Sequence, residues 1–246
     1  MKVDFFIVGA MRSGTSSIRD QLDLDPKINM AHGEPMFFSN DKKYQQGFSE
    51  YHALFDWSNS DVVLRGEKSP RYAVSPTAPK RVYDYNSEAK IIWMLRDPVK
   101  RAISHYIHSV YRAGDKATSL DEAIENSGEL EKSNSTMAYV FRSQYEKQID
   151  AWSKYFPHQK IVILEDLINN SESVMGEIYD YLEVDPGIAL GFQRHSRVKV
   201  DQEKAKIEKS NPTTVAQKEK LFELLEPTII EIEDMLGRRL DAWRAH

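Results

Sequence analysis

Short runs of apolar residues alternate along the chain with longer segments of helical periodicity. Three of these runs, at residues 3–8, 90–95 and 160–164, are almost continuously apolar, as strands buried on both faces are. The predicted helices cover residues 16–24, 98–111, 137–156, 173–182 and 213–236, the last with a kink or break at Pro227. This pattern predicts an α/β fold in which helices flank a P-loop-like parallel sheet.

The composition narrows the class of protein. The chain has 246 residues, a formal net charge of −5, 41% hydrophobic residues and no cysteine. This length and apolar content predict a single domain over residues 1–246. The missing cysteine excludes disulfides, zinc-thiolate sites and thiol nucleophiles, and no stretch approaches the ~20 apolar residues of a membrane span. We therefore expect a cytoplasmic protein. We do not expect it to bind nucleic acid, because proteins that bind nucleic acid are usually basic and this chain is mildly acidic.

A glycine-containing loop follows the first apolar run. Residues 9–16 keep the glycine spacing of a nucleotide P-loop, but Thr15 stands where a P-loop has its phosphate-binding lysine. The cation comes earlier in the loop, at Arg12. A P-loop kinase or hydrolase is therefore disfavoured. The hydroxyl and N–H donors at a helix start favour an anion site over a simple strand-to-helix turn.

A second candidate anion site follows the run at residues 90–95. Arg96 lies at the predicted carboxyl end of that strand, and Ser104 falls on the polar side of the next helix, near Arg101 and His108. Taken alone, this turn is more typical of a capped helix, because Asp97 is a good N-cap residue.

Two further features leave alternatives open. Residues 191–211 are basic and poor in apolar residues, which is typical of a solvated loop or of a mobile flap over an anionic ligand. His105 and His108 lie three residues apart on a predicted helix. Without a third ligand nearby in sequence, we interpret both as surface polar residues rather than as metal ligands.

Taken together, these segments resemble a known enzyme family. The stretches that carry the resemblance are residues 6–16, 66–72, 95–106 and 144–167, and it ends with residues 236–238 and Trp243. In this order they resemble the sulfotransferases that use 3′-phosphoadenosine 5′-phosphosulfate (PAPS). The nearest pattern is the carbohydrate branch typified by heparan sulfate 3-O-sulfotransferases. The resemblance implies the sulfotransferase fold, transfer of a sulfuryl group from PAPS to a hydroxyl group, and adenosine 3′,5′-bisphosphate as the product.

The resemblance also implies which residues bind PAPS, and it implies that no metal ion takes part. The loop residues Arg12, Ser13, Gly14, Thr15 and Ser16 are expected to hold the 5′-phosphosulfate. Arg96 and Ser104 are expected to hold the 3′-phosphate. The disulfide-closed cofactor loop of similar enzymes is absent, and Arg197 and Lys199 are expected to substitute for its contacts.

Candidate catalytic residues follow from the same resemblance. Arg12 and Lys68 are expected to balance the charge that develops on the leaving phosphate, and Glu34 to act as the base. His32 is the rival base, because histidine titrates near neutral pH. Glu67 is interpreted as a structural partner of Lys68 or Arg71.

The acceptor is expected to be a hydroxyl group of a carbohydrate or another glycosylated molecule. The alternatives are a tyrosine side chain or a small metabolite, a P-loop nucleotide kinase, and a catalytically silent nucleotide-binding or scaffold protein. The glycan pattern usually has a lysine before the base and a histidine and an aspartate after it. Gly33, Met36 and Ser39 stand in those places here.

Overall fold

The computed structural model describes residues 1–113, 119–188, 198–210 and 212–244, without the side chains of residues 113, 198–201, 203 and 204. The chain divides into two compact units. The first comprises Met1–Leu95 and Gln148–Arg194, and the second comprises Arg96–Lys147 and His195–His246. A single domain over residues 1–246 therefore stays a prediction, and each unit is described by itself.

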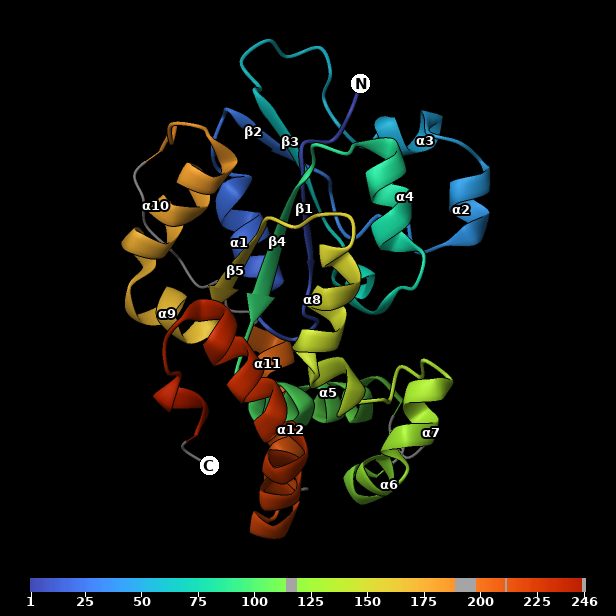
Figure 1. Cartoon of the computed structure of the whole chain (residues 1–246), viewed down its shortest axis with the longest axis vertical. Coiled ribbons are helices and arrows are strands. Elements are labelled where there is room, and N and C mark those ends of the chain that lie inside the picture. Colours follow the sequence, from blue (N-terminus) through green and yellow to red (C-terminus); the bar gives the residue numbers. More distant parts are fainter. Residues whose placement is uncertain (114–118, 189–197, 211, 245–246) are drawn as a thin grey trace. The chain divides into compact units, whose positions relative to one another are not determined.

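The first unit contains a five-stranded parallel sheet in the order β2-β3-β1-β4-β5. Its strands are β1 (Phe5–Gly9), β2 (Ile28–Met30), β3 (Leu64–Lys68), β4 (Lys90–Leu95) and β5 (Gln159–Ile163). Its helices are α1 (Thr15–Leu22), α2 (Asp41–Gln45), α3 (Ser49–His52), η1 (Pro70–Val74), α4 (Ala78–Tyr85), α9 (Leu164–Asn169) and α10 (Ser171–Leu182). The predicted α/β class with a parallel sheet is confirmed (Figure 1).

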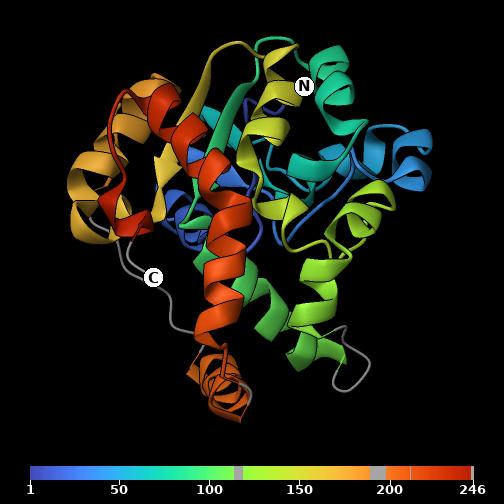
Figure 2. The same cartoon turned by 60° about the horizontal axis from the view of Figure 1, so that its bottom comes forward.

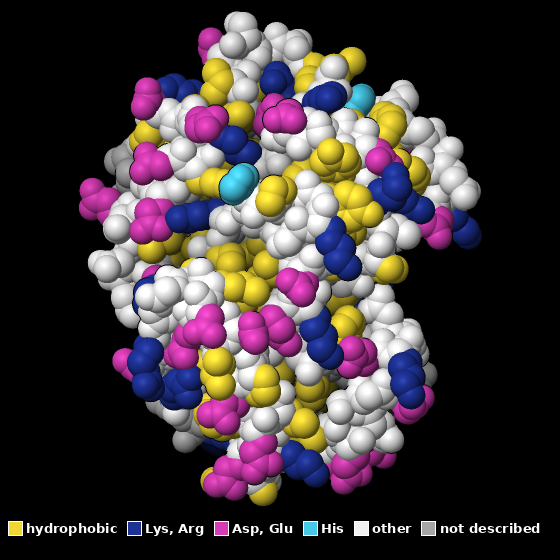
Figure 3. Space-filling view, viewed as in Figure 1, with side chains coloured by type: hydrophobic (Ala, Val, Ile, Leu, Met, Phe, Trp, Pro, Cys, Tyr) yellow, Lys and Arg dark blue, Asp and Glu magenta, His cyan; other side chains and the backbone are white. Residues whose placement is uncertain are grey.

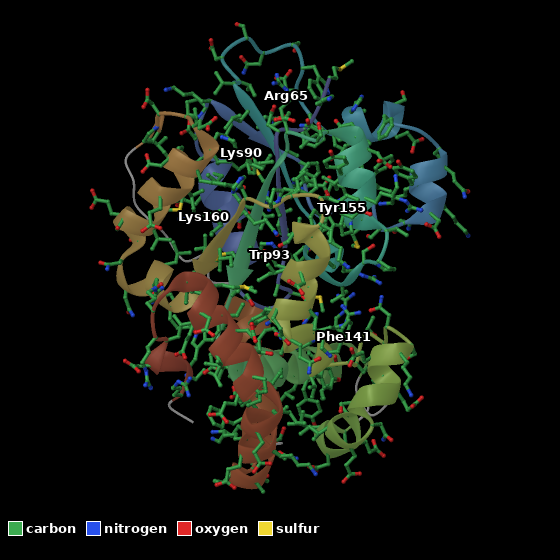
Figure 4. All side chains as sticks on the ribbon, viewed as in Figure 1. Arg65, Lys90, Trp93, Phe141, Tyr155 and Lys160 are labelled. Atoms are coloured by element: carbon green, nitrogen blue, oxygen red, sulfur yellow. The ribbon has the colours of Figure 1, made fainter. Side chains whose placement is uncertain are left out.

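The apolar runs form strands because both faces of the sheet are covered. On one face, Ile7 of β1 and Met94 of β4 share a core with Ile18 of α1 and Ile178 of α10. On the other face, Trp93 lies beside α8 (Tyr145–Ser153), where its ring meets that of Trp152 edge to face at 6.3 Å (Figure 4). Every side chain of β1 is buried, which explains why the run does not alternate with polar residues.

Ion pairs at the rim tie the sheet to α10. Lys160 of β5 pairs with Glu177 of α10 at 2.7 Å, and Lys90 of β4 pairs with Glu183 at 2.9 Å. Both lysines are labelled in Figure 4. Because all five strands are parallel, their carboxyl ends lie at one edge, where open α/β sheets bind ligands. The segments that follow Gly9, Met30 and Lys68 therefore begin at the same edge of this unit.

The second unit is helical. It contains α5 (Pro98–Ala113), α6 (Leu120–Glu125), α7 (Ser127–Lys132), η3 (Phe141–Ser143), the first residues of α8, α11 (Val198–Ser210), α12 (Val215–Leu236) and η4 (Asp241–Trp243). Both α11 and α12 pack against α5 (Figure 2). Its core includes Val99 and Ala102 of α5, Ile124 of α6, and Leu221 and Leu225 of α12.

Two of the helix predictions need correction. A single helix over residues 137–156 is wrong, because η3 and α8 replace it. The Ser143 hydroxyl lies 3.0 Å from the Tyr139 carbonyl oxygen, a local contact of the kind that competes with helix formation. It also lies 3.0 Å from the carbonyl oxygen of Pro98, which is distant in the sequence. A break at Pro227 is also wrong, because α12 runs uninterrupted from Val215 to Leu236. A proline inside a helix costs about 3 kcal/mol, and burial of one face of α12 outweighs this; the fully buried apolar residues of that face are Leu221, Leu225, Ile229 and Ile232.

The basic segment at residues 191–211 lies partly outside the described residues, which omit 191–197 and 211. Its residues 198–210 form α11, so the loop prediction is wrong there. Lysine, glutamate and alanine are good helix formers, and no glycine or proline interrupts this stretch.

Within the described part of the chain, no helix combines the length and the apolar composition needed to cross a membrane. Positive and negative side chains are interspersed over the face shown in Figure 3.

Candidate functional site

The loop between β1 and α1 lies at the carboxyl end of the central strand. Gly14 occupies the N-cap position of α1 with φ of 87°, and Arg12 also has a positive φ of 76°. A Cβ atom on Gly14 would lie 2.8 Å from Leu164 Cδ1. Glycine is therefore required at this turn for its backbone conformation and for space.

Two observations on this loop fit a bound phosphate or sulfate group. Ser13 is fully buried, and its Oγ has no hydrogen-bond partner among the described residues. No side chain caps the first turn of α1, because its N-cap residue is a glycine. N–H groups at a helix start and a neighbouring hydroxyl are donors that suit an anion.

Lys68 brings three segments of the first unit together. Its ammonium group donates to Glu34 Oε1 at 2.6 Å and to Ser16 Oγ at 3.2 Å. The Lys68 side chain is only 6% exposed, whereas that of Glu34 is 37% exposed. A buried cation thus lies between a solvent-accessible carboxylate and the first turn of α1.

Strand pairing places Lys68 at this point. Lys68 is the last residue of β3 and lies beside Ile7 of β1, and the Ser69 N–H donates to the Ile7 carbonyl group at 3.1 Å. The segment that carries Glu34 follows β2, which pairs with the other side of β3. The Ala31 N–H extends that pairing by donating to the Gly66 carbonyl group at 2.8 Å. The sheet order therefore brings Glu34, Lys68 and Ser16 together.

Glu67 does not pair with Lys68 or Arg71, so that interpretation is wrong. Its side chain is fully buried and accepts a hydrogen bond from the Tyr51 hydroxyl. Adjacent strand residues point to opposite faces, which separates Glu67 from Lys68. Burial raises the pKa of Glu67 above its usual range, although hydrogen bonds from Tyr51 and Tyr72 oppose the shift. Tyr51 lies 16 residues before Glu67, and no signal in the sequence predicted their contact.

Arg96 and Ser104 belong to the second unit and are half-buried there. The Arg96 carbonyl group accepts a hydrogen bond from the Tyr145 hydroxyl at 2.8 Å. The predicted N-cap is confirmed, because Asp97 Oδ1 accepts from the N–H groups of Val99 and Lys100 at 2.9 and 3.1 Å.

The remaining predicted residues are placed as follows. His32, the rival base, is exposed on the segment that also carries Glu34. Arg197 lies outside the described residues. Lys199 lies on α11, and its side chain is outside the description. The assigned roles of the predicted site residues stay predictions.

Comparison with known proteins identifies the family. The family model described as "Sulfotransferase domain" matches residues 2–223. The chain belongs to this sulfotransferase family. It is 30% identical to heparan sulfate glucosamine 3-O-sulfotransferase 5 of Mus musculus over 161 residues, which are 65% of this chain and 46% of that protein. It is 29% identical to heparan sulfate glucosamine 3-O-sulfotransferase 3B1 of Homo sapiens over 180 residues, or 72% of this chain and 45% of that protein.

Structural comparison gives the same family fold. A sulfotransferase from Alicyclobacillus acidocaldarius has a TM-score of 0.76 and 24% sequence identity, with 99% of both chains covered. The sulfotransferase chain spans slightly less than half the length of the two curated relatives above. The match to the family extends over both units, because it runs from residue 2 to residue 223.

Two residues of α5 in this sulfotransferase differ from their predicted environment. Arg101 is fully buried rather than on the polar side, and its guanidinium group donates to Ser143 Oγ at 2.6 Å and to the Tyr139 carbonyl group at 2.7 Å. His105 is buried beside it, with 3.3 Å between His105 Nδ1 and Arg101 Nη1. The surface interpretation of His105 is therefore wrong. Among the described residues, no group of three or more histidine, aspartate or glutamate side chains is arranged to hold a metal ion.

Proposed function

We propose that this sulfotransferase moves a sulfuryl group from PAPS to a hydroxyl group of a carbohydrate or glycosylated acceptor by in-line displacement. The observation that carries the proposal is the position of Lys68, whose ammonium group bonds both the Glu34 carboxylate and Ser16 of the phosphate loop. In the proposal, Glu34 is the base, Lys68 is the cation and residues 12–16 are the anion-binding loop, and these three segments begin at the carboxyl edge of the parallel sheet.

PAPS supplies the sulfuryl group and leaves as adenosine 3′,5′-bisphosphate. In the proposal, residues 12–16 hold its 5′-phosphosulfate, and Arg96 with Ser104 holds its 3′-phosphate. Arg197 and Lys199 add contacts to the nucleotide. The uncapped start of α1 and the unpartnered Ser13 hydroxyl support the first of these assignments.

The residues of this chain have separate roles in the transfer. Glu34 takes the proton of the acceptor hydroxyl as the acceptor oxygen forms its bond to sulfur. The bond between sulfur and the bridging oxygen breaks, and its electron pair stays on the 5′-phosphate. Lys68 and Arg12 balance the negative charge that grows there. Positioning and electrostatic stabilisation supply most of the catalysis in the analogous phosphoryl transfer.

The names of the curated relatives support a carbohydrate acceptor. The two relatives compared above are heparan sulfate glucosamine 3-O-sulfotransferases. We therefore place glycans ahead of tyrosine side chains and small metabolites as acceptors.

The deciding experiment incubates the protein with sulfur-35-labelled PAPS and a panel of glycans, phenols and lipids. We expect a labelled glycan, and a drop in labelling of about 100-fold in Glu34→Gln, which is the scale of general base catalysis. Glu129→Gln is the matched control, because Glu129 forms an exposed ion pair with Lys132 at 2.7 Å. Equal labelling by wild type and Glu34→Gln would remove Glu34 from the role of base, and His32→Gln would then test the rival. Binding of magnesium-ATP without binding of adenosine 3′,5′-bisphosphate would overturn the proposed function.

A further inference from the structure

We infer that Ser69, Tyr72 and Glu67 are positioning residues that hold the base-carrying segment, residues 34–38, in place beside Lys68. This inference rests on the proposed function, because it assigns a role to neighbours of the proposed base. None of the three residues is placed in contact with the donor or the acceptor. They act through the backbone of the segment that carries Glu34.

The segment at residues 34–38 has no helix or strand to fix it. Its backbone is instead held by side chains from outside the segment. The Met36 N–H donates to Ser69 Oγ at 2.9 Å, and the Phe38 N–H donates to the Tyr72 hydroxyl at 3.1 Å. Met36 itself has a positive φ of 50°. Two charged side chains also hold this backbone, because Lys43 Nζ donates to the Pro35 carbonyl group at 2.7 Å and Arg81 Nη1 donates to the Phe38 carbonyl group at 3.2 Å. The two hydroxyl groups that follow β3 hold the N–H groups of the segment, and the two cations hold its carbonyl groups.

Glu67 is a buried neighbour of the tyrosine residues that support this segment. Burial, followed by the charge of Glu67, raises the pKa of Tyr72 well above its usual value, so the phenol keeps its proton. The Tyr72 oxygen accepts from the Phe38 N–H at 3.1 Å, and Glu67 lies close enough for its charge to raise the pKa of Tyr72. The Tyr51 hydroxyl donates to the Glu67 carboxylate, and the Tyr51 ring stacks on Phe37 of the base-carrying segment. Glu67 thus supports the segment through its tyrosine neighbours.

Aromatic packing holds the far end of the segment independently of these hydroxyl groups. The Phe37 ring stacks on Tyr51 with centroids 4.6 Å apart, and the Phe38 ring meets Phe6 edge to face at 5.7 Å. Removal of one hydroxyl group therefore leaves the apolar contacts in place. We expect a shift of the Glu34 end rather than unfolding.

The geometry links both members of the proposed catalytic pair to one stretch of chain. Lys68 directly precedes Ser69, and Glu34 lies two residues before the Met36 amide that Ser69 holds. The hydrogen bond from Met36 to Ser69 thus joins the two chain segments within two residues of the 2.6 Å contact between Lys68 and Glu34. Small displacements of reacting groups are costly, and 1 Å is enough to lower a rate about 100-fold.

The first test compares Tyr72→Phe with the matched control Tyr85→Phe. Tyr85 is also buried in the aromatic cluster, and its hydroxyl accepts a backbone N–H, that of Val3, at 2.9 Å. We expect Tyr72→Phe to lower kcat for sulfur-35 transfer to the glycan identified above by about tenfold, with KM for PAPS unchanged. We expect Tyr85→Phe to leave both constants near those of wild type. Each of the two variants loses one buried hydroxyl group, so we expect similar falls in their thermal stability.

The second test uses amide hydrogen exchange, which does not require activity. Tyr72→Phe should increase exchange in the peptide containing Phe38, and Ser69→Ala in the peptide containing Met36. Ser75→Ala is the control for Ser69, because the Ser75 hydroxyl accepts the Ala78 N–H at 3.1 Å, outside the segment. Glu67→Gln should also increase exchange in the peptide containing Phe38, because it removes the charged group that accepts from Tyr51 and acts on Tyr72.

The outcomes separate this inference from the proposed function. Sulfur transfer by wild type, with loss of kcat and faster exchange only in the Ser69, Tyr72 and Glu67 variants, supports the inference. Sulfur transfer by wild type with equal effects in Tyr72→Phe and Tyr85→Phe overturns the inference alone. Absence of sulfur transfer by wild type overturns the proposed function and, with it, this inference.

Discussion

Substitution of Lys68 by methionine should abolish most of the activity while it leaves the fold nearly intact. The Lys68 side chain is only 6% exposed. Methionine keeps much of the apolar stem of lysine, so it preserves the packing around this side chain. The substitution removes the ammonium group, its 2.6 Å bond to Glu34 and its 3.2 Å bond to Ser16.

The expected effect on stability is small. The Glu34 carboxylate is 37% exposed, so water solvates it once the lysine is gone, and no charge is stranded in the interior. Partly exposed ion pairs contribute about 1 kcal/mol or less. For a chain of this length, that free energy corresponds to a fall in Tm of about 2–4 °C.

The expected effect on catalysis is much larger. Removal of one group that stabilises charge in a transition state typically lowers kcat by about 10² to 10³, or about 2.7–4 kcal/mol. The assay measures kcat for sulfur-35 transfer and Tm on the same preparation. Lys80→Met is the matched control, because Lys80 pairs with Asp84 at the same 2.6 Å on the exposed side of α4. A fall in kcat of less than about threefold in Lys68→Met would refute the catalytic role of Lys68.

Three further predictions test the loop, the buried carboxylate and the anion sites. Gly14→Ala should lower stability by about 1–2 kcal/mol, because its φ is 87° and a Cβ would lie 2.8 Å from Leu164; thermal unfolding measures this, with Gly128→Ala as the control. Burial raises the pKa of Glu67 above the ordinary 4.5, so the folded protein binds a proton at Glu67 more tightly than the unfolded chain does. The stability that this proton contributes is lost as pH rises from 4.5 through the folded-state pKa. Glu67→Gln should flatten that fall, which urea unfolding between about pH 5 and 8 checks. Arg96→Ala should mainly weaken binding of adenosine 3′,5′-bisphosphate, whereas Arg12→Ala should also lower kcat; equal effects on both parameters in the two variants would contradict this division.

Local pattern was sufficient to predict the elements that depend on local residues. The run at residues 90–95 became β4 with the predicted bounds, and the helix at residues 173–182 became α10, which begins two residues earlier. Asp97 caps α5 as expected. Strand runs, caps and glycine turns depend on neighbours within a few residues, which is why the sequence shows them.

Local pattern failed where side chains bind partners far away in the chain. Helical periodicity placed Arg101 on the polar face of α5, but hydrogen bonds to Ser143 and the Tyr139 carbonyl group satisfy it in the interior. Pro227 predicted a kink or a break, and the break is wrong because buried contacts of α12 keep that helix continuous. In both cases tertiary packing outweighed a local preference.

The candidate site shows the same division. The sequence by itself determined the loop at residues 9–16, the resemblance to PAPS-dependent sulfotransferases, and Glu34 and Lys68 as candidates for the chemistry. Only the tertiary structure decided that Lys68 contacts both Glu34 and Ser16, which precede it in the sequence by 34 and 52 positions, respectively. It also decided that Glu67 joins Tyr51 and Tyr72 in a buried cluster beside the base-carrying segment. The physical reason is the strand order, which inserts β3 between β2 and β1. The pairing of distant strands depends on the packing of the whole sheet, and no local pattern records it.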